Sequence, residues 1–149
     1  MIDAYLSAVR QENQTVNRLF GYMGISIVEI TPEHAVLALP FREEFLQGAG
    51  SLAGGIQAAL MDETMAHAVL AGLEPDRRTV TMDLHMRYLR PAGRSSLRAE
   101  ARIVRRGGKV VVVEGEIRND AGETLSLATA SFLIIRPDTR QPKGKDSPA

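Results

Sequence analysis

The segment GSLAGGIQAALMDETMAHAVLAG, residues 50–72, decides the fold of this chain. It is almost entirely apolar from about 53 to 70, and a glycine and a proline follow it, which together predict one long helix. Gly54 and Gly55 open the helix, and one carboxylate, Asp62, lies in the middle of it. Because a buried charge is costly unless it has a partner or a task, these three residues are the first candidates for function.

Short β segments surround the helix in the sequence. Two of them, 25–30 and 34–40, flank a turn that contains a proline. After the helix, apolar residues alternate over 79–89, which predicts a half-buried strand with Val80, Met82, Leu84, Met86 and Tyr88 on one side and Thr79, Thr81, Asp83, His85 and Arg87 on the other. Three more β runs are joined by the turn sequences RRGGK and NDAGE, and they span residues 97–104, 109–118 and 124–135. Consecutive hairpins of this kind predict an antiparallel sheet.

The predicted fold is α+β, with an antiparallel sheet wrapped around one central helix. A long apolar helix must bury itself against a surface, and the apolar face of the sheet is the large one available. We expect one domain over residues 1–136, with an additional N-terminal helix at 1–19. The polar, proline-rich segment 137–149 is predicted to be a disordered tail.

Composition excludes several classes of function. The 149 residues have a formal net charge of zero and 5% aromatic residues, so we expect no nucleic-acid partner. The chain has no cysteine and its three histidines lie on separate elements, so we expect no metal site. No apolar run reaches the roughly 18 residues that span a bilayer, and the N-terminus lacks the features of a signal peptide. These observations predict a cytoplasmic protein without a membrane partner.

A helical wheel separates Asp62 from the other polar residues of the helix. At about 100° per residue, one arc holds Gln57, Leu60, Glu63, Thr64, His67 and Ala71. Asp62 lies nearly opposite, on the side predicted to face the sheet or a partner chain. Glu63 and His67 are expected to form a solvated or interface pair. Asp62 can be a structural carboxylate bonded to a strand, or a partly desolvated base or nucleophile, and spacing alone leaves both open.

The two glycines favour the catalytic interpretation. Backbone amides at a helix N-terminus lack partners within the helix, and a glycine lets a ligand approach them closely, as an oxyanion hole requires. Close packing of the helix start is the alternative. Gly55 and Asp62 are roughly 10 Å apart along one helix axis, so both can act on one carbonyl only if they come from two chains. The chemistry therefore predicts a dimer with antiparallel central helices.

The stretch QGAGSLAGGIQAALMDETM, residues 47–65, resembles the signature of hotdog-fold thioesterases of the phenylacetate-pathway (PaaI-like) group. That signature has an Asn, a Gly, a His-Gly-Gly triplet and an acidic residue seven positions after the last Gly. The corresponding positions here are Gln47, Gly50, Ala53, Gly54, Gly55 and Asp62. The segment 79–93 resembles the strand that follows in the family, and the likeness spans about residues 20–136.

The resemblance implies hydrolysis of an acyl-CoA thioester, with coenzyme A present only as part of the substrate and no other cofactor. It implies that Asp62 acts as nucleophile or as base for water, that the amide of Gly55 from the other subunit holds the thioester oxygen, and that Thr81 and Gln47 orient the reacting groups. Homodimers and homotetramers are both common in the family. The candidate substrate-binding residues are Gly54, Ala53, Arg90, Arg105, Arg106 and Lys109, of which the four cations would meet the coenzyme A phosphates or be ordinary surface charges.

Two departures from the family pattern lower the expected activity. Ala53 replaces the family His and Gln47 replaces the Asn, and the loss of one such contact costs about 10²-fold in rate by analogy with an oxyanion donor. One alternative is therefore a non-catalytic acyl-CoA-binding or sensing protein. A second is a hotdog hydratase or dehydratase that pairs Asp62 with His67, although these side chains point about 140° apart on the wheel.

Overall fold

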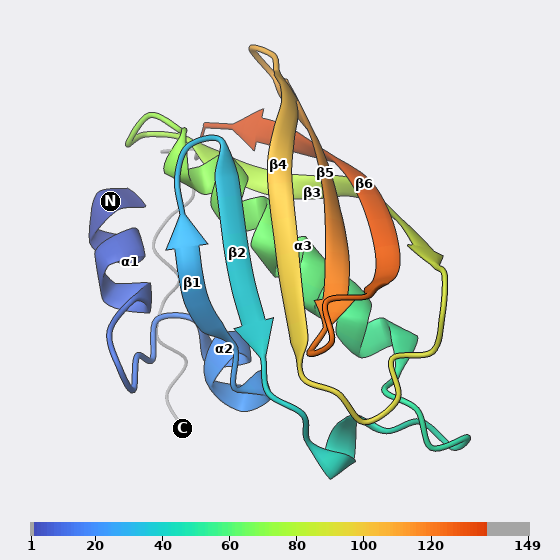
Figure 1. Cartoon of the computed structure of the whole chain (residues 1–149). Coiled ribbons are helices and arrows are strands. Elements are labelled where there is room, and N and C mark those ends of the chain that lie inside the picture. Colours follow the sequence, from blue (N-terminus) through green and yellow to red (C-terminus); the bar gives the residue numbers. More distant parts are fainter. Residues whose placement is uncertain (1, 137–149) are drawn as a thin grey trace, which may run out of the picture.

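The computed structural model describes residues 2–136, and its elements follow the predicted order (Figure 1). Two short helices come first, then a hairpin, the long helix and four further strands. Their bounds are α1 Ile2–Val9, α2 Arg18–Met23, β1 Ser26–Ile30, β2 His34–Leu39, a 3-10 turn at Glu43–Phe45, α3 Gly54–Ala71, β3 Arg78–Tyr88, β4 Leu97–Arg106, β5 Val110–Asn119 and β6 Thr124–Ile135.

The strands form one antiparallel six-stranded sheet in the order β1-β2-β4-β5-β6-β3. The sheet curls around α3, which contacts every strand (Figure 1). β4 illustrates how the sheet packs on this helix. Leu97, Ala99 and Ala101 are buried against α3, while the residues between them are exposed. The predicted α+β fold, with a central helix inside an antiparallel sheet, is confirmed.

The long helix, all six strands and the two hairpins at RRGGK and NDAGE lie where the sequence predicts them, to within about two residues at most ends. The predicted N-terminal helix at 1–19 is wrong in its extent. α1 ends at Val9, Asn13 has a φ of 61°, and a new helix begins after Asn17, whose side chain accepts hydrogen bonds from the amides of Leu19 and Phe20. This side-chain cap starts α2 and divides the segment into two helices.

The prediction that side chains alternate between the two faces of β3 without interruption is also wrong. Residues Thr81 and Asp83 pair with the adjacent residues Phe132 and Ser131 of β6, so Met82 is an extra residue in a β-bulge. The bulge shifts the alternation by one, and Thr81 therefore lies on the α3 side together with Leu84, Met86 and Tyr88.

Among the described residues, no helix is long and apolar enough to cross a membrane. The predicted disordered tail, 137–149, lies outside the described residues.

Candidate active site on the central helix

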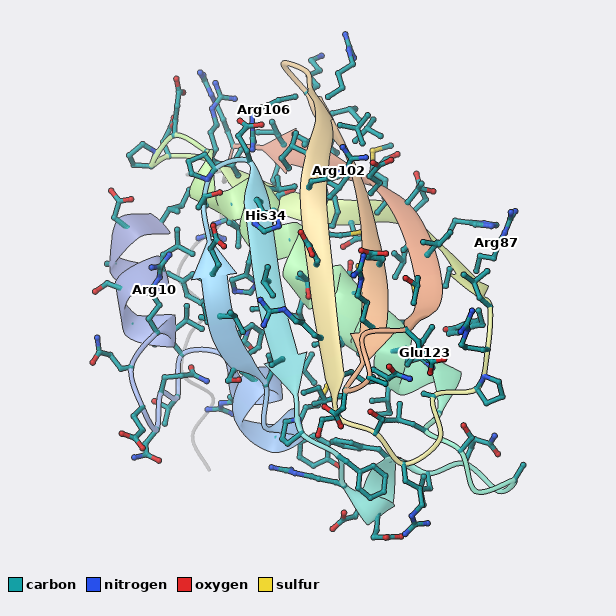
Figure 2. The ribbon with its side chains drawn as sticks, in the orientation of Figure 1. Arg10, His34, Arg87, Arg102, Arg106 and Glu123 are labelled. Atoms are coloured by element: carbon teal, nitrogen blue, oxygen red, sulfur yellow. The ribbon has the colours of Figure 1, made fainter. Side chains whose placement is uncertain are left out.

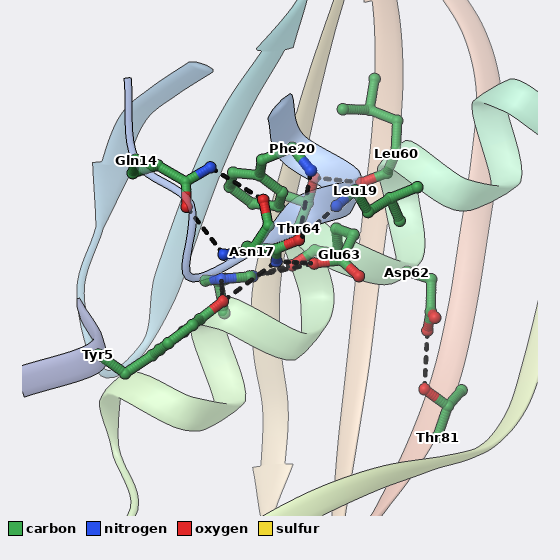
Figure 3. Close-up of polar contacts among 11 residues, drawn as sticks. Tyr5, Gln14, Asn17, Leu19, Phe20, Leu60, Asp62, Glu63, Thr64 and Thr81 are labelled. Atoms are coloured by element: carbon green, nitrogen blue, oxygen red, sulfur yellow. Dashed lines mark hydrogen bonds and ion pairs between the residues drawn. The ribbon is translucent and has the colours of Figure 1, made fainter. Parts of the chain in front are cut away.

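Asp62 lies in the middle of α3, half-buried, and faces the edge strand β3. The hydroxyl of Thr81 donates a hydrogen bond to Asp62 Oδ1 at 2.8 Å (Figure 3). Within residues 2–136 this is the one hydrogen bond recorded for the carboxylate, which leaves Oδ2 open to water or a substrate. The bond holds the carboxylate toward the sheet, one of the two orientations that the helical wheel predicts. Thr81 can reach it only because of the β-bulge at Met82.

Gly54 and Gly55 form the first turn of α3, and their amides point away from any partner in the same chain. Within residues 2–136, neither amide donates a recorded hydrogen bond, as expected for the first residues of a helix. Gly55 is exposed, and a Cβ added to it would meet nothing within 4 Å. The start of α3 therefore presents open donors at the positive end of the helix dipole.

The two halves of the predicted site do not meet within one chain. Seven residues of helix separate Gly55 from Asp62, which corresponds to roughly 10 Å. A thioester carbonyl on the Gly55 amide would thus lie out of reach of Asp62 in the same chain.

The loop before α3 holds the two positions that depart from the family pattern. The amide oxygen of Gln47 accepts a hydrogen bond from the backbone of Ala49, so this side chain stabilises its own turn. Ala53 caps α3 without a side-chain hydrogen bond, and its own amide donates to the carbonyl of Phe45 at 2.8 Å. Neither side chain is recorded in contact with Asp62.

The four candidate cations lie at opposite ends of α3. Arg90 pairs with Glu123 at 3.3 Å, near the N-terminal end. Arg105 and Lys109 are exposed around the β4–β5 hairpin, whereas Arg106 donates to the carbonyls of Pro32 and Val69. Figure 2 shows Arg106 near the top of the view and Glu123 well below it, toward the lower right. Arg106 therefore caps the C-terminal carbonyls of α3, which gives this side chain a structural role within the chain.

The predicted Glu63–His67 pair is present, with Nδ1 of His67 3.7 Å from Glu63 Oε2. It is not solvated, because this side of α3 is largely buried. His67 is 1% exposed. Its Nδ1 lies 2.6 Å from the carbonyl of Glu63, so Nδ1 donates, and Nε2 accepts from the hydroxyl of Tyr5 at 2.9 Å. Asn17 donates to Glu63 Oε2 at 3.0 Å and also to Tyr5 (Figure 3).

Tyr5, Asn17, Glu63 and His67 form one hydrogen-bonded cluster, and burial is the main cause of the pKa shifts of His67 and Glu63. Burial lowers the pKa of His67, against the bond to the Glu63 carbonyl, which raises it. Burial also raises the pKa of Glu63, with a smaller contribution in the same direction from the neighbouring Asp62 charge. Figure 3 shows the cluster on one side of α3 and the Asp62–Thr81 pair on another. His67 is thus bound to Tyr5 and not to Asp62, which argues against the hydratase pairing.

Sequence reasoning missed Tyr88, at the end of β3. Its hydroxyl donates to the carbonyl of Gly54 at 2.6 Å, directly at the start of α3. The available signal was a tyrosine on a half-buried strand, because such a hydroxyl normally finds a hydrogen-bond partner.

Comparison with known sequences identifies relatives over most of the chain. Residues 49–126 match the family model described as the thioesterase superfamily. A candidate esterase from Saccharolobus solfataricus is 27% identical over 131 residues, which cover 88% of this chain and 93% of that protein. A candidate esterase from Deinococcus radiodurans is 32% identical over 114 residues, which cover 76% of this chain and 71% of that protein.

Solved structures share the fold. A phenylacetic acid degradation-related protein from Ralstonia eutropha, described as a candidate thioesterase, is 30% identical with a TM-score of 0.79, over 87% of this chain and 98% of that one. The PaaI protein of the phenylacetic acid degradation operon of E. coli has a TM-score of 0.74 at 24% identity, over 80% of this chain and 85% of that one. The resemblance to this group is confirmed.

Proposed function

This chain belongs to the thioesterase superfamily, and we propose that it hydrolyses the thioester of an acyl-CoA to a free acid and coenzyme A. We expect it to act as a homodimer or homotetramer in the cytoplasm. The observation that supports the proposal most strongly is the carboxylate of Asp62, held through one oxygen by Thr81 and open at the other.

The proposed reaction begins with the thioester oxygen on the amide of Gly55. That amide stabilises the negative charge that develops on the oxygen during attack, and the helix dipole adds to the effect. Asp62 either attacks the thioester carbon or removes a proton from the water that attacks it. In the first route the coenzyme A thiolate leaves and the acyl-aspartyl anhydride is cleaved by water. In the second route water loses a proton to Asp62 as it adds to the thioester carbon, and the tetrahedral intermediate then expels the thiolate, which takes up that proton.

A dimer would bring the amide of Gly55 in one chain within reach of Asp62 in the other. The outer edge of β3 is unpaired within the described residues, and Val80 and Met82 beside it are 45% and 57% exposed. A long strand edge with exposed apolar side chains is a surface that proteins normally cover. Two copies paired along β3 by a twofold axis would run their α3 helices antiparallel, so that Gly55 of each copy approaches Asp62 of the other.

The same antiparallel arrangement brings the C-terminal end of one α3 toward the N-terminal end of the other. Arg105 and Lys109 of one chain and Arg90 of the other would then lie toward the same end of the paired helices. We propose these three as the cations for the coenzyme A phosphates. Gln47 and Ala53 would line the approach to the Gly55 amide.

Mixed dimers test the shared site directly. Asp62→Asn removes the carboxylate, and Gly55→Pro removes the amide N–H without breaking a recorded bond within the chain. In a site shared between subunits, each mixed dimer has one site with both groups intact. Random mixing of the two inactive variants makes half of the dimers mixed, so co-expression should restore about a quarter of wild-type turnover. A mixture as inactive as either variant would place both groups in one chain's site and refute the proposal.

A non-catalytic acyl-CoA-binding protein is the second candidate. The observation that favours it is Ala53, whose side chain offers no polar contact at the helix start. Saturable binding of an acyl-CoA without thiol release would support it.

A further inference from the structure

The start of α3 has little local support of its own. Ala53 caps it without a side-chain hydrogen bond, and the first two helical residues are Gly54 and Gly55. Glycine has the weakest helix propensity after proline, and alanine is a poor cap. A helix with this sequence would fray at its first turn, although the proposed chemistry needs the amides of that turn in a fixed direction.

Tyr88 supplies the support from outside the helix. Its hydroxyl donates to the carbonyl of Gly54 at 2.6 Å. A Cβ at Gly54 would lie 3.1–3.3 Å from two ring carbons and the hydroxyl oxygen of Tyr88, so this side chain covers the Gly54 backbone at close range. A tyrosine hydroxyl is protonated and able to donate at neutral pH, and partial burial raises the pKa of Tyr88 further. The glycine at 54 is explained by this close approach.

The strand β3 holds both halves of the candidate site. Thr81, near one end of β3, fixes Asp62 in the middle of α3, and Tyr88, at the other end, holds the carbonyl of Gly54. The two contacts lie on the same side of β3 because of the bulge at Met82. One strand thus sets both the position of the carboxylate and the direction of the helix start.

We infer that Tyr88 is a positioning residue for the oxyanion site, because it clamps the first turn of α3 and thereby fixes the amides of Gly54 and Gly55. The inference rests on the proposed function for its catalytic consequence. The clamp itself is a property of the fold, and it can be measured without any substrate.

The test compares Tyr88→Phe with wild type. The substitution keeps the ring over Gly54 and removes only the hydroxyl. Tyr22→Phe is the matched control, since Tyr22 is 78% exposed and its side chain has no recorded hydrogen bond among the described residues. The first readout is hydrogen exchange of the amides of Ile56 and Gln57, which donate to the carbonyl of Ala53 and report directly on fraying of the first turn.

We expect Tyr88→Phe to speed exchange at these two amides by about tenfold and to leave the middle of α3 unchanged. We expect kcat on an acyl-CoA to fall by about tenfold with KM within about twofold, since a loosened donor costs less than a deleted one. The control should change neither quantity.

Unchanged exchange in Tyr88→Phe would overturn the clamp. Faster exchange with unchanged kcat would overturn its positioning role in catalysis. A wild-type protein without thioesterase turnover would refute the proposed function, and the exchange measurement would then still decide whether the clamp exists.

Discussion

Gly54 and Gly55 are adjacent in one helical turn, and we predict that alanine has opposite consequences at the two positions. A Cβ at Gly55 would meet nothing within 4 Å in its own chain. Gly55→Ala should therefore gain the helix propensity of alanine and raise the free energy of unfolding by about 0.5–1 kcal/mol. In a chain of 149 residues this corresponds to a rise in Tm of roughly 1–4 °C.

At Gly54 the same methyl group would lie 3.1–3.3 Å from the ring of Tyr88, closer than ordinary van der Waals contact. The ring would have to move away, which weakens the hydrogen bond to the Gly54 carbonyl. We expect the gain in propensity to be cancelled, so that the stability of Gly54→Ala is equal to or below that of wild type.

Urea denaturation of the two variants and wild type measures this difference, and a thiol-release assay measures its functional cost. We expect Gly55→Ala to be the more stable and the less active protein, because its methyl group lies where the thioester oxygen must approach the amide. Equal stabilisation by both substitutions would refute the close packing of Tyr88 on Gly54. A loss of stability in Gly55→Ala would refute the open surface assigned to Gly55, and full activity would refute the role of its amide in binding the thioester oxygen.

Three further predictions concern the carboxylate, the buried histidine and the helix cap. Thr81→Val should lower kcat by about 10–100-fold with little change in Tm, because it removes the donor to Asp62. The control is Thr79→Val, which loses only a hydrogen bond to a strand carbonyl. Equal kcat values in the two variants would contradict the role of Thr81. Burial lowers the pKa of His67 in the folded state. As pH falls below about 6.5, the imidazole is therefore protonated more readily in the unfolded chain than in the folded one, and the free energy of unfolding should decrease. His67→Gln should show a shallower decline in Tm between about pH 7 and pH 5, and parallel declines would rule out a contribution from His67. Ala53→His should raise turnover if the missing imidazole limits the rate, whereas unchanged turnover would mean that the site operates without it.

The sequence predicts those features that depend on neighbouring residues in the chain. The long helix, the two hairpins and the antiparallel sheet follow from apolar spacing and turn residues, and Asp62 and Gly55 stand out because each conflicts with its local context. The roughly 10 Å between them also follows from helix geometry alone.

Features that depend on distant partners could not be predicted in this way. The polar arc of α3 is buried because Tyr5, Asn17 and Ser126, each far away in the sequence, satisfy its hydrogen bonds. The bulge at Met82 exists only in the pairing of β3 with β6, and without it Thr81 would face away from Asp62. Tyr88 was missed for the same reason, since its partner Gly54 lies on another element.

The most direct test of the account is a thiol-release assay with short, medium, long and aryl acyl-CoAs on wild type and Asp62→Asn in parallel. Asparagine has nearly the shape of aspartate and can still accept the hydrogen bond of Thr81, so the variant should fold and assemble like wild type. We predict that wild type turns over at least one class of acyl-CoA and that Asp62→Asn reduces this turnover by about 10³-fold. Turnover that survives in folded Asp62→Asn, or wild-type protein that releases no thiol from any of the substrates, would contradict it.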